Sequence, residues 1–159
     1  MNEVYQFEQI DPNDRKTQQT IARWYEQEWT TPQDKTLSRL ASLSPEGQEF
    51  HFLVRHEGEP IAAGGLSNEV HLLKVHPEYQ KYGPWVALLY TLPSYRNRGI
   101  GKQLLEQVET EAGRRGLSRI YLYTFTAESL YLRAGWRAIE RFIYRGNDAV
   151  IMEKEITKS

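Results

Sequence analysis

The order of apolar and polar residues at the start of the chain predicts one strand followed by two helices. Residues 4–10 alternate as a strand does, and residues 21–29 place apolar side chains at helical spacing after Asp14, which is suited to cap a helix. A second helix is expected to follow at once, with Thr31 as its N-cap and Pro32 as its first helical residue.

Two further strands are predicted in the next segment. Residues 50–54 alternate between apolar and polar, and residues 61–66 resume as a strand after a turn rich in Glu, Gly and Pro. The pair Gly64-Gly65 should weaken or bulge this strand. We expect the strand to extend toward Leu73 and a loop to cover residues 76–83.

The middle of the chain predicts a buried strand, a long helix and another strand. Residues 84–92 are nearly all apolar, so both faces of this strand should be covered and the strand should be central in its sheet. Residues 99–115 carry an apolar stripe at helical spacing, and residues 118–124 read as a strand. This succession implies a right-handed parallel crossover.

The last quarter predicts a short helix over residues 126–134 and two strands over residues 136–144 and 149–154. Residues 145–148 between the strands have the composition of a hairpin turn. The resulting order, β-α-α-β-β-β-α-β-α-β-β, predicts an α/β protein of the α+β mixed-sheet kind rather than a doubly wound one. The length of 159 residues fits one domain, residues 1–159.

Composition narrows the functions to consider. The 20 Lys and Arg balance 21 Asp and Glu, so we expect neither nucleic acid nor a membrane as a partner. The lack of cysteine excludes thiolate metal sites and a covalent acyl-cysteine intermediate. The N-terminus has no signal-peptide pattern and no apolar run is long enough to span a membrane, so a cytoplasmic protein is expected.

The string from Tyr90 to Leu105 carries the most informative chemistry. A buried strand stops at Pro93, a short basic loop follows, and a helix opens at two glycines. Glycines allow close backbone approach, and the unpaired amides and dipole of a helix start favour an anion. Arg96, Arg98 and Lys102 add full positive charges. The sequence therefore predicts a cradle for a phosphate or pyrophosphate.

Two well-known phosphate loops do not fit this string. A Walker A loop needs G-x-x-x-x-G-K-[ST], whose spacing and hydroxyl are missing here. A Rossmann fingerprint needs a third glycine where this chain has Leu104. The four histidines form no compact metal motif, so no metal is expected.

Three segments together resemble the GNAT superfamily of acyl-CoA-dependent N-acetyltransferases. Residues 96–101, R-N-R-G-I-G, resemble its [Q/R]-x-x-G-x-[G/A] loop, and the preceding L-x-x-L-P-x-Y-R resembles its central strand. Leu130 to Trp136, L-Y-L-R-A-G-W, resembles its Y-x-x-x-G-[F/W] element. The resemblance covers roughly residues 84–136, and the element order agrees with it from the first strand to the last.

The resemblance implies a GNAT-like fold with splayed central strands and acetyl-CoA as co-substrate. Backbone groups of Leu89, Tyr90 and Thr91 would pair with the pantetheine arm, as in β-augmentation. Tyr131 would be the general acid that protonates the departing thiolate. The pyrophosphate would be held by a loop comprising Arg96, Asn97, Arg98, Gly99, Ile100, Gly101 and Lys102.

The general base is where the chain departs from the family pattern. Many relatives carry a Glu on the strand after the long helix, but that strand here is S-R-I-Y-L-Y-T. Glu28, Glu69 and His71 are the candidate bases, and a water-mediated route is the alternative. Glu28 and Trp29 are also candidate contacts to the acceptor, because the first helices of this fold rim the acceptor pocket.

Three functions remain open at this stage. We expect an enzyme that moves an acetyl group from acetyl-CoA to a primary amine, on a small molecule or a peptide, by direct attack in a ternary complex. A catalytically silent acyl-CoA sensor or scaffold of the same fold is the alternative. A phosphate- or nucleotide-binding protein of another family is disfavoured by the broken Walker and Rossmann patterns. The final hairpin could pair with a second copy, so a homodimer is one expectation.

Overall fold

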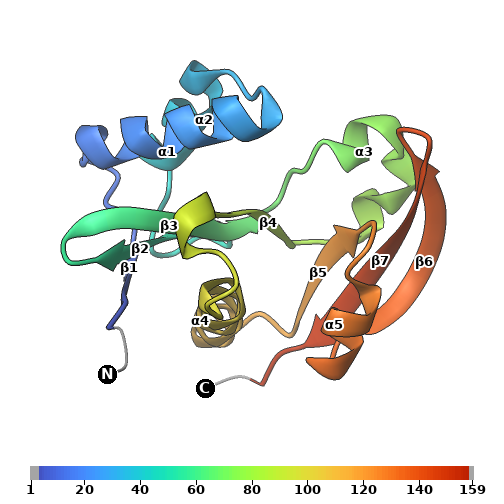
Figure 1. Ribbon diagram of the computed structural model, residues 1–159. Coiled ribbons are helices and arrows are strands. Elements are labelled where there is room, and N and C mark those ends of the chain that lie inside the picture. Colours follow the sequence, from blue (N-terminus) through green and yellow to red (C-terminus); the bar gives the residue numbers. More distant parts are fainter. Residues whose placement is uncertain (1–3, 158–159) are drawn as a thin grey trace.

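Seven strands form one mixed sheet with helices on both of its faces (Figure 1). The computed structural model describes residues 4–157. The strands lie in the order β1-β2-β3-β4-β5-β7-β6. In chain order the elements are β1 (Gln6–Gln9), α1 (Arg15–Trp29), α2 (Gln33–Ala41), β2 (Phe50–His56), β3 (Glu59–Ser67), α3 (Leu72–Val75), the 3-10 helix η1 (Pro77–Lys81), β4 (Trp85–Thr91), the 3-10 helix η2 (Pro93–Tyr95), α4 (Ile100–Arg114), β5 (Arg119–Thr124), α5 (Glu128–Arg133), β6 (Arg137–Tyr144) and β7 (Asn147–Glu155). The mixed-sheet fold class predicted from the sequence is confirmed.

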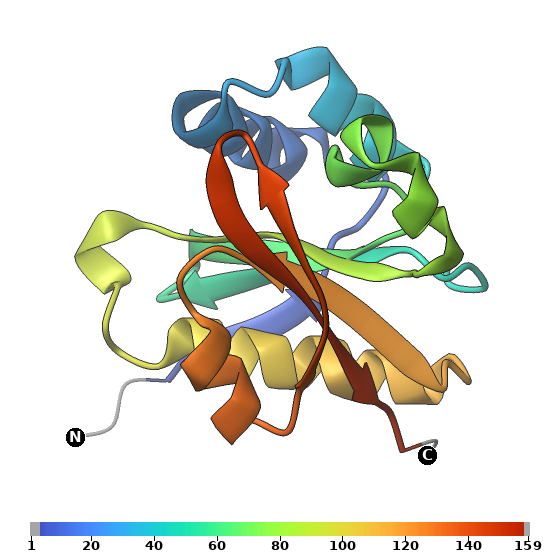
Figure 2. The ribbon, with the colours of Figure 1, turned by 90° about the vertical axis from the view of Figure 1, so that its right-hand side faces the viewer.

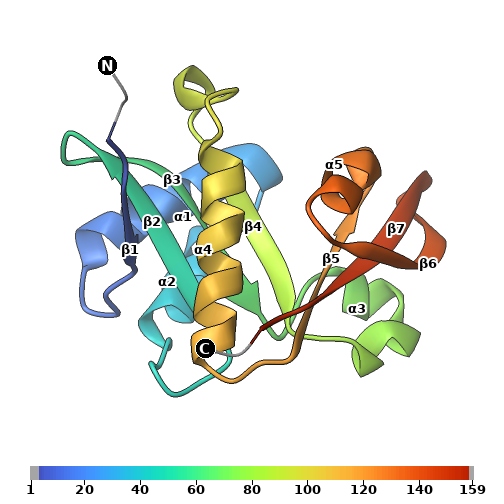
Figure 3. The ribbon, with the colours of Figure 1, turned by 90° about the horizontal axis from the view of Figure 1, so that it is seen from below.

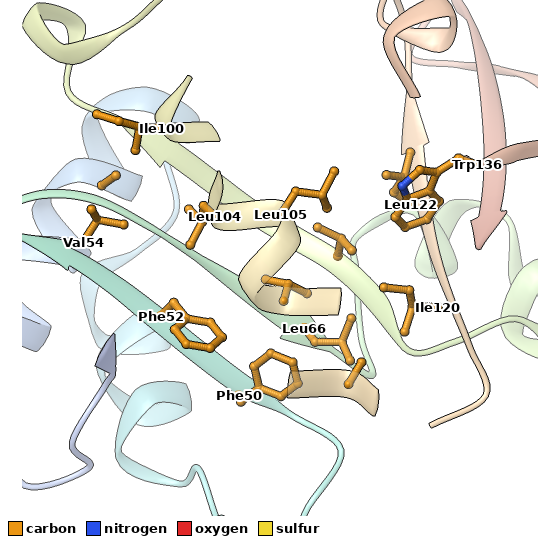
Figure 4. Packing of buried hydrophobic residues seen from close by; sticks show 14 of the residues in the cluster. Phe50, Phe52, Val54, Leu66, Ile100, Leu104, Leu105, Ile120, Leu122 and Trp136 are labelled. Carbon is orange, nitrogen blue, oxygen red and sulfur yellow. The ribbon is translucent and has the colours of Figure 1, made fainter. Parts of the chain in front are cut away.

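The two faces of the sheet are covered by different helices. We call the face under α1 and α2 the α1 face, and the face under α4 the α4 face (Figure 1). The predicted apolar stripe of α4 packs on the α4 face against side chains of β2, β3 and β5 (Figure 4). Its buried members are Ile100, Leu104, Leu105, Val108 and Ala112.

The two N-terminal helices begin differently from one another. Asp14 caps α1 as predicted, since its carboxylate accepts from the Thr17 amide at 3.2 Å and the Thr17 hydroxyl at 2.7 Å. The predicted cap of α2 is wrong by one residue. Pro32, with ψ 136°, is the N-cap of α2 and no side chain caps it; its carbonyl accepts from the Lys35 and Thr36 amides.

The segment between β3 and β4 is helical where the sequence suggested a strand extension and a loop. β3 ends at Ser67, and α3 and η1 follow. Leu72 is fully buried beside Trp85 in an aromatic-rich cluster, so burial of this side chain fixes α3 against the sheet. The expected extension of the strand toward Leu73 is therefore wrong.

The sheet opens between its two central strands. β4 and β5 run parallel and pair at Trp85↔Tyr121, after which they diverge (Figure 3). The predicted crossover and splay are both present. At the far end of the sheet, β6 and β7 are joined by Arg145 and Gly146, with φ 53° and 77°, which is the left-handed pair of a tight hairpin turn.

Candidate functional site

A bulge interrupts β4 where the sheet opens. Ala63 pairs with Tyr90 and Gly65 pairs with Ala87, so both Leu88 and Leu89 lie opposite Gly64. Leu88 has φ 62°, a left-handed conformation that is unfavourable for a leucine. A Cβ on Gly64 would lie 2.4 Å from Leu89 Cδ2, so the bulge needs glycine on the neighbouring strand.

Two buried side chains hold this bulge. The Tyr25 hydroxyl donates to the Leu88 carbonyl at 2.8 Å and lies 2.7 Å from His51 Nε2. Because a tyrosine hydroxyl has one proton, His51 must carry its proton on Nε2 and donate to Tyr25. Both side chains are buried, and burial raises the pKa of Tyr25 and lowers the pKa of His51 well below 6.5. Both groups are therefore neutral, which fixes the direction of the two hydrogen bonds.

Beyond the bulge, one side of the β4 backbone is open. The Leu92 amide donates to the Ile61 carbonyl of β3 at 2.9 Å. Since alternate residues of a strand turn their backbone groups to opposite sides, the groups of Leu89 and Thr91 face the gap toward β5. Those of Tyr90 face β3, so only two of the three residues expected to meet the pantetheine arm present their backbone to the gap.

The loop after β4 gathers unpaired amides at the start of α4. Asn97 and Gly99 have φ 65° and 81°, and Gly99 is the N-cap of α4. Within residues 4–157, no backbone hydrogen bond is donated by the amides of Asn97, Gly99, Ile100, Gly101 and Lys102. A Cβ on Gly101 would meet nothing within 4 Å. Unpaired amides in such a turn, with the helix dipole behind them, form an anion site.

The cations of this loop lie against aromatic rings. The Arg96 guanidinium carbon is 5.7 Å from the Tyr90 ring centroid, and Arg96 Nε donates to the Thr91 carbonyl at 2.9 Å. The corresponding carbon of Arg98 is 5.1 Å from the Tyr95 centroid. Lys102 is exposed in the first turn of α4. The structure thus brings together all the loop residues that the sequence selected.

Tyr131 approaches from the α4 face. It lies on α5, packs against the core shared by α4 and the sheet, and sits 6.0 Å from the Trp136 ring, centroid to centroid. Leu89 borders the same core. In the described part of the chain no partner binds the Tyr131 hydroxyl, and burial raises its pKa. Tyr131 therefore stays protonated at neutral pH and is available as a donor.

On the opposite face, the candidate base His71 belongs to a cluster whose two tyrosines, Tyr123 and Tyr144, were not singled out from the sequence. Tyr123 of β5 lies beside Tyr144 of β6, with ring centroids 5.7 Å apart. The Tyr144 hydroxyl is 2.6 Å from His71 Nδ1, and Arg145 Nη2 is 3.2 Å from the same nitrogen. The alternation of Tyr121 and Tyr123 along β5 was the available signal, because alternate residues share a face.

The acceptor candidates on α1 lie at its C-terminal end, which is directed toward the side of the molecule that carries α3 and the β6–β7 hairpin (Figure 1). Trp29 is 41% exposed, and its ring lies 6.1 Å from Tyr90. Glu28 is exposed beside it, and Glu69 is exposed before α3. Across residues 4–157 neither carboxylate has a hydrogen-bond or ion-pair partner, so the structure holds neither in a defined direction.

No group of three or more His, Cys, Asp or Glu side chains in the described chain is arranged to hold a metal ion. None of the helices between residues 4 and 157 is both long and apolar enough to cross a membrane.

The comparisons with known proteins agree with this geometry. No curated protein sequence matched the chain. The ribosomal-protein-S18-alanine N-acetyltransferase of Escherichia coli is similar in structure, with TM-score 0.67 and 18% identity over 98% of this chain and 96% of that one. An aminoglycoside 6′-N-acetyltransferase complexed with coenzyme A gives TM-score 0.73 and 15% identity over 97% and 98%. The Enterococcus faecium aminoglycoside 6′-N-acetyltransferase gives 0.72 and 15% over 97% and 98%.

At these identities the solved structures establish the fold, whereas the sequence family is established by a separate match. The model of the acetyltransferase (GNAT) family matches residues 15–136, which is more than half of the chain. The open strand, the glycine loop and Tyr131 all lie inside this range. The chain belongs to the GNAT family of acetyltransferases.

Proposed function

We propose that this protein transfers an acetyl group from acetyl-CoA to a primary amine by direct attack in a ternary complex, with Tyr131 as the general acid. The observation that carries the proposal is a run of backbone groups without a strand or helix partner. It begins at Leu89 and the Thr91 amide on the open side of β4 and resumes at the amides of Asn97, Gly99, Ile100, Gly101 and Lys102. A ligand with an amide-bearing arm and a pyrophosphate fits this arrangement, since the arm can bind along β4 and the pyrophosphate at the start of α4.

The two parts of this run suit the two parts of coenzyme A. The pantetheine arm can add to β4 as a strand would, through hydrogen bonds to Leu89 and Thr91. The pyrophosphate can accept from the unpaired amides at the start of α4, next to Arg98 and Lys102. Arg96 Nε donates to the Thr91 carbonyl, so Arg96 positions the loop in addition to adding positive charge to it.

Acetyl transfer needs a proton donor for the sulfur. A bond forms between the amine nitrogen and the acetyl carbon, the carbon–sulfur bond breaks, and the thiolate must be neutralised. Tyr131 borders the same core as Leu89, and its raised pKa keeps its proton in place until the thiolate develops. We assign the donation of this proton to Tyr131.

A catalytically silent acyl-CoA-binding protein is the second candidate. One observation favours it: β5 carries no acidic side chain from Arg119 to Thr124, so the base position used by many relatives is empty of carboxylate. Binding without turnover would then be the outcome. Release of free thiol from acetyl-CoA in the presence of an amine separates the two candidates.

The experiment measures thiol release with the purified protein and a panel of amines. The panel contains an aminoglycoside with a 6′-amine and a peptide that begins with alanine, because structural neighbours act on these classes, together with an amino acid and a polyamine. Acetyl-CoA binding without thiol release from any amine would favour the silent candidate. Absence of acetyl-CoA binding would contradict both.

Tyr131→Phe tests the role of the acid. Turnover should fall by about 100-fold or more, the usual weight of general acid catalysis. The dissociation constant of acetyl-CoA, measured by calorimetry, should stay within about twofold because binding rests on backbone groups. Tyr79→Phe in η1 is the matched control and should leave both values unchanged. Unchanged turnover in Tyr131→Phe would remove this residue from the mechanism.

A further inference from the structure

Three side chains, Tyr123, Tyr144 and His71, lie next to one another on the α1 face, beside the opening of the sheet. Tyr123 lies two residues beyond the last pair of β4 and β5, where the strands have begun to separate. Its ring is 6.3 Å from Trp85 and 5.7 Å from Tyr144. His71 precedes α3 and contacts Tyr144 (Figures 1 and 2 show α3 beside the β6–β7 hairpin).

The hydrogen bonds to His71 Nδ1 share one direction. Arginine has only donors, so His71 Nδ1 accepts from Arg145 and carries no proton. The Tyr144 hydroxyl, 2.6 Å from the same nitrogen, must therefore donate to it. Its oxygen keeps lone pairs that can accept a proton from Tyr123, whose ring lies 5.7 Å from that of Tyr144, centroid to centroid. A proton that Tyr123 passes to Tyr144 can therefore continue toward His71.

The charges around His71 keep its ring neutral. Partial desolvation of the ring lowers its pKa first, followed by the positive charges of Arg145 on the hairpin turn, Lys74 on α3 and Lys35 on α2. Burial also raises the pKa of Tyr123 to about 12. At neutral pH His71 Nδ1 is therefore unprotonated. Tyr123 keeps its hydroxyl proton unless it can transfer that proton to Tyr144.

We infer that Tyr123, Tyr144 and His71 form the route by which the attacking amine loses its proton, with His71 as the terminal base. This inference rests on the proposed acetyl transfer. It supplies a base where β5 lacks a carboxylate. It also separates the two proton transfers in space, because Tyr131 reaches the gap from the α4 face and Tyr123 lies on the α1 face.

As the nitrogen–carbon bond forms, the amine proton passes to the Tyr123 oxygen, the Tyr123 proton to Tyr144 and the Tyr144 proton to His71 Nδ1. The carbon–sulfur bond breaks and the sulfur takes the proton of Tyr131. His71 releases the hydrogen bond from Arg145, which is exposed, and returns a proton to water through its own exposed ring. Tyr131 regains a proton from water.

His71→Asn gives the sharpest test, because its side-chain oxygen can still accept from Tyr144 and Arg145 but cannot bind a transferable proton. The kcat/KM for the amine should fall by about 100-fold. The wild-type profile of kcat/KM should drop on the acid side as His71 becomes protonated, and this acid limb should disappear in the variant. Acetyl-CoA binding should be retained, since His71 lies away from the loop before α4.

The controls separate a proton route from a structural role. Tyr123→Phe and Tyr144→Phe should lose the same acid limb, and combining either with His71→Asn should cost little more than one change alone. His76→Asn, next to the same hairpin and bonded to the Ile143 carbonyl, should keep the limb. An acid limb that persists in His71→Asn overturns the route alone. Absence of acetyl transfer by the wild-type protein overturns the route together with the proposed function.

Discussion

Tyr25→Phe removes the one oxygen that joins α1, β2 and the bulge of β4. In the wild-type protein this oxygen donates to the Leu88 carbonyl and accepts from His51, and both distances are below 3 Å. The phenylalanine ring fills the same space, so the change leaves packing intact and removes only the two hydrogen bonds. Tyr25→Phe therefore isolates the contribution of this polar contact to the shape of β4.

The magnitude follows from burial. A buried polar group that loses its partner costs about 1–3 kcal/mol, and this change strands both the Leu88 carbonyl and the His51 Nε2 proton. We expect the free energy of unfolding to fall by about 2–4 kcal/mol. A domain is stable by about 5–15 kcal/mol, so the variant should still fold. The left-handed conformation of Leu88, which costs about 1–2 kcal/mol, would lose the bond that opposes its relaxation.

Relaxation of the bulge should also weaken coenzyme binding, because Leu89 and Thr91 would turn away from the gap. We expect the dissociation constant of acetyl-CoA to rise about tenfold, or about 1.4 kcal/mol. Urea unfolding followed by tryptophan fluorescence measures the stability, and calorimetry measures the binding. Tyr79→Phe is the control. A loss of unfolding free energy below about 0.5 kcal/mol, with unchanged binding, would refute the assignment of this contact as the support of the bulge.

Three further predictions follow from other parts of the molecule. Gly64→Ala should reduce the unfolding free energy by about 1–3 kcal/mol, because its Cβ would overlap Leu89. Gly47→Ala is the control and should change the unfolding free energy little, because the atom nearest to its Cβ is 3.7 Å away. Equal losses of unfolding free energy in the two variants would contradict the reasoning. Burial holds the pKa of His51 below 6.5, so the unfolded chain binds a proton there that the folded protein does not. The unfolding free energy should therefore fall as the pH drops below 6.5, by up to about 1.4 kcal/mol per pH unit, and a slope that is the same in His51→Gln would exclude this source. Gly101→Glu places a carboxylate in the open space beside the unpaired amides, so acetyl-CoA affinity should fall more than about tenfold. The free energy of unfolding should be unchanged or raised by about 0.5 kcal/mol, because an acidic side chain is favourable at a helix start. Retained affinity would place the pyrophosphate elsewhere.

The features predicted from the sequence are those with a local signal. The apolar run of β4, the apolar stripe of α4 and the glycines at the start of α4 each lie within one short segment of the chain. The spacing of the apolar residues in these segments directly reflects which side chains are buried. The hairpin turn was likewise predicted from the local composition of residues 145–148, in which Gly146 readily accepts the positive φ that the turn needs. Even a strong local signal leaves boundaries uncertain, as the start of α2 at Pro32 shows.

The features that were missed depend on contacts between distant residues. Tyr25 meets His51 across 26 positions and Leu88 across 63, so no local pattern reveals that they hold one bulge. His71 meets Tyr144 across 73 positions. In the sequence the tyrosines look like core aromatics and His51 like an isolated histidine, while His71 was a candidate base without a known partner. Their roles emerge only when the sheet has brought β2, β4 and β6 into place.

The single pair between β4 and β5 makes the middle of the sheet its weakest seam. On one side, β1 to β4 are joined by antiparallel ladders of several residue pairs each, bulges included, and on the other, β5, β7 and β6 are joined in the same way. Across this seam the two halves share the core under α4, so side-chain packing holds them together more than backbone hydrogen bonds do. A coenzyme arm in the gap would bridge the two halves and raise the free energy of unfolding by about 2.7 kcal/mol at 100 times its dissociation constant, so the melting temperature would rise with its concentration. A thermal-shift titration would then report binding at the seam without any acceptor present.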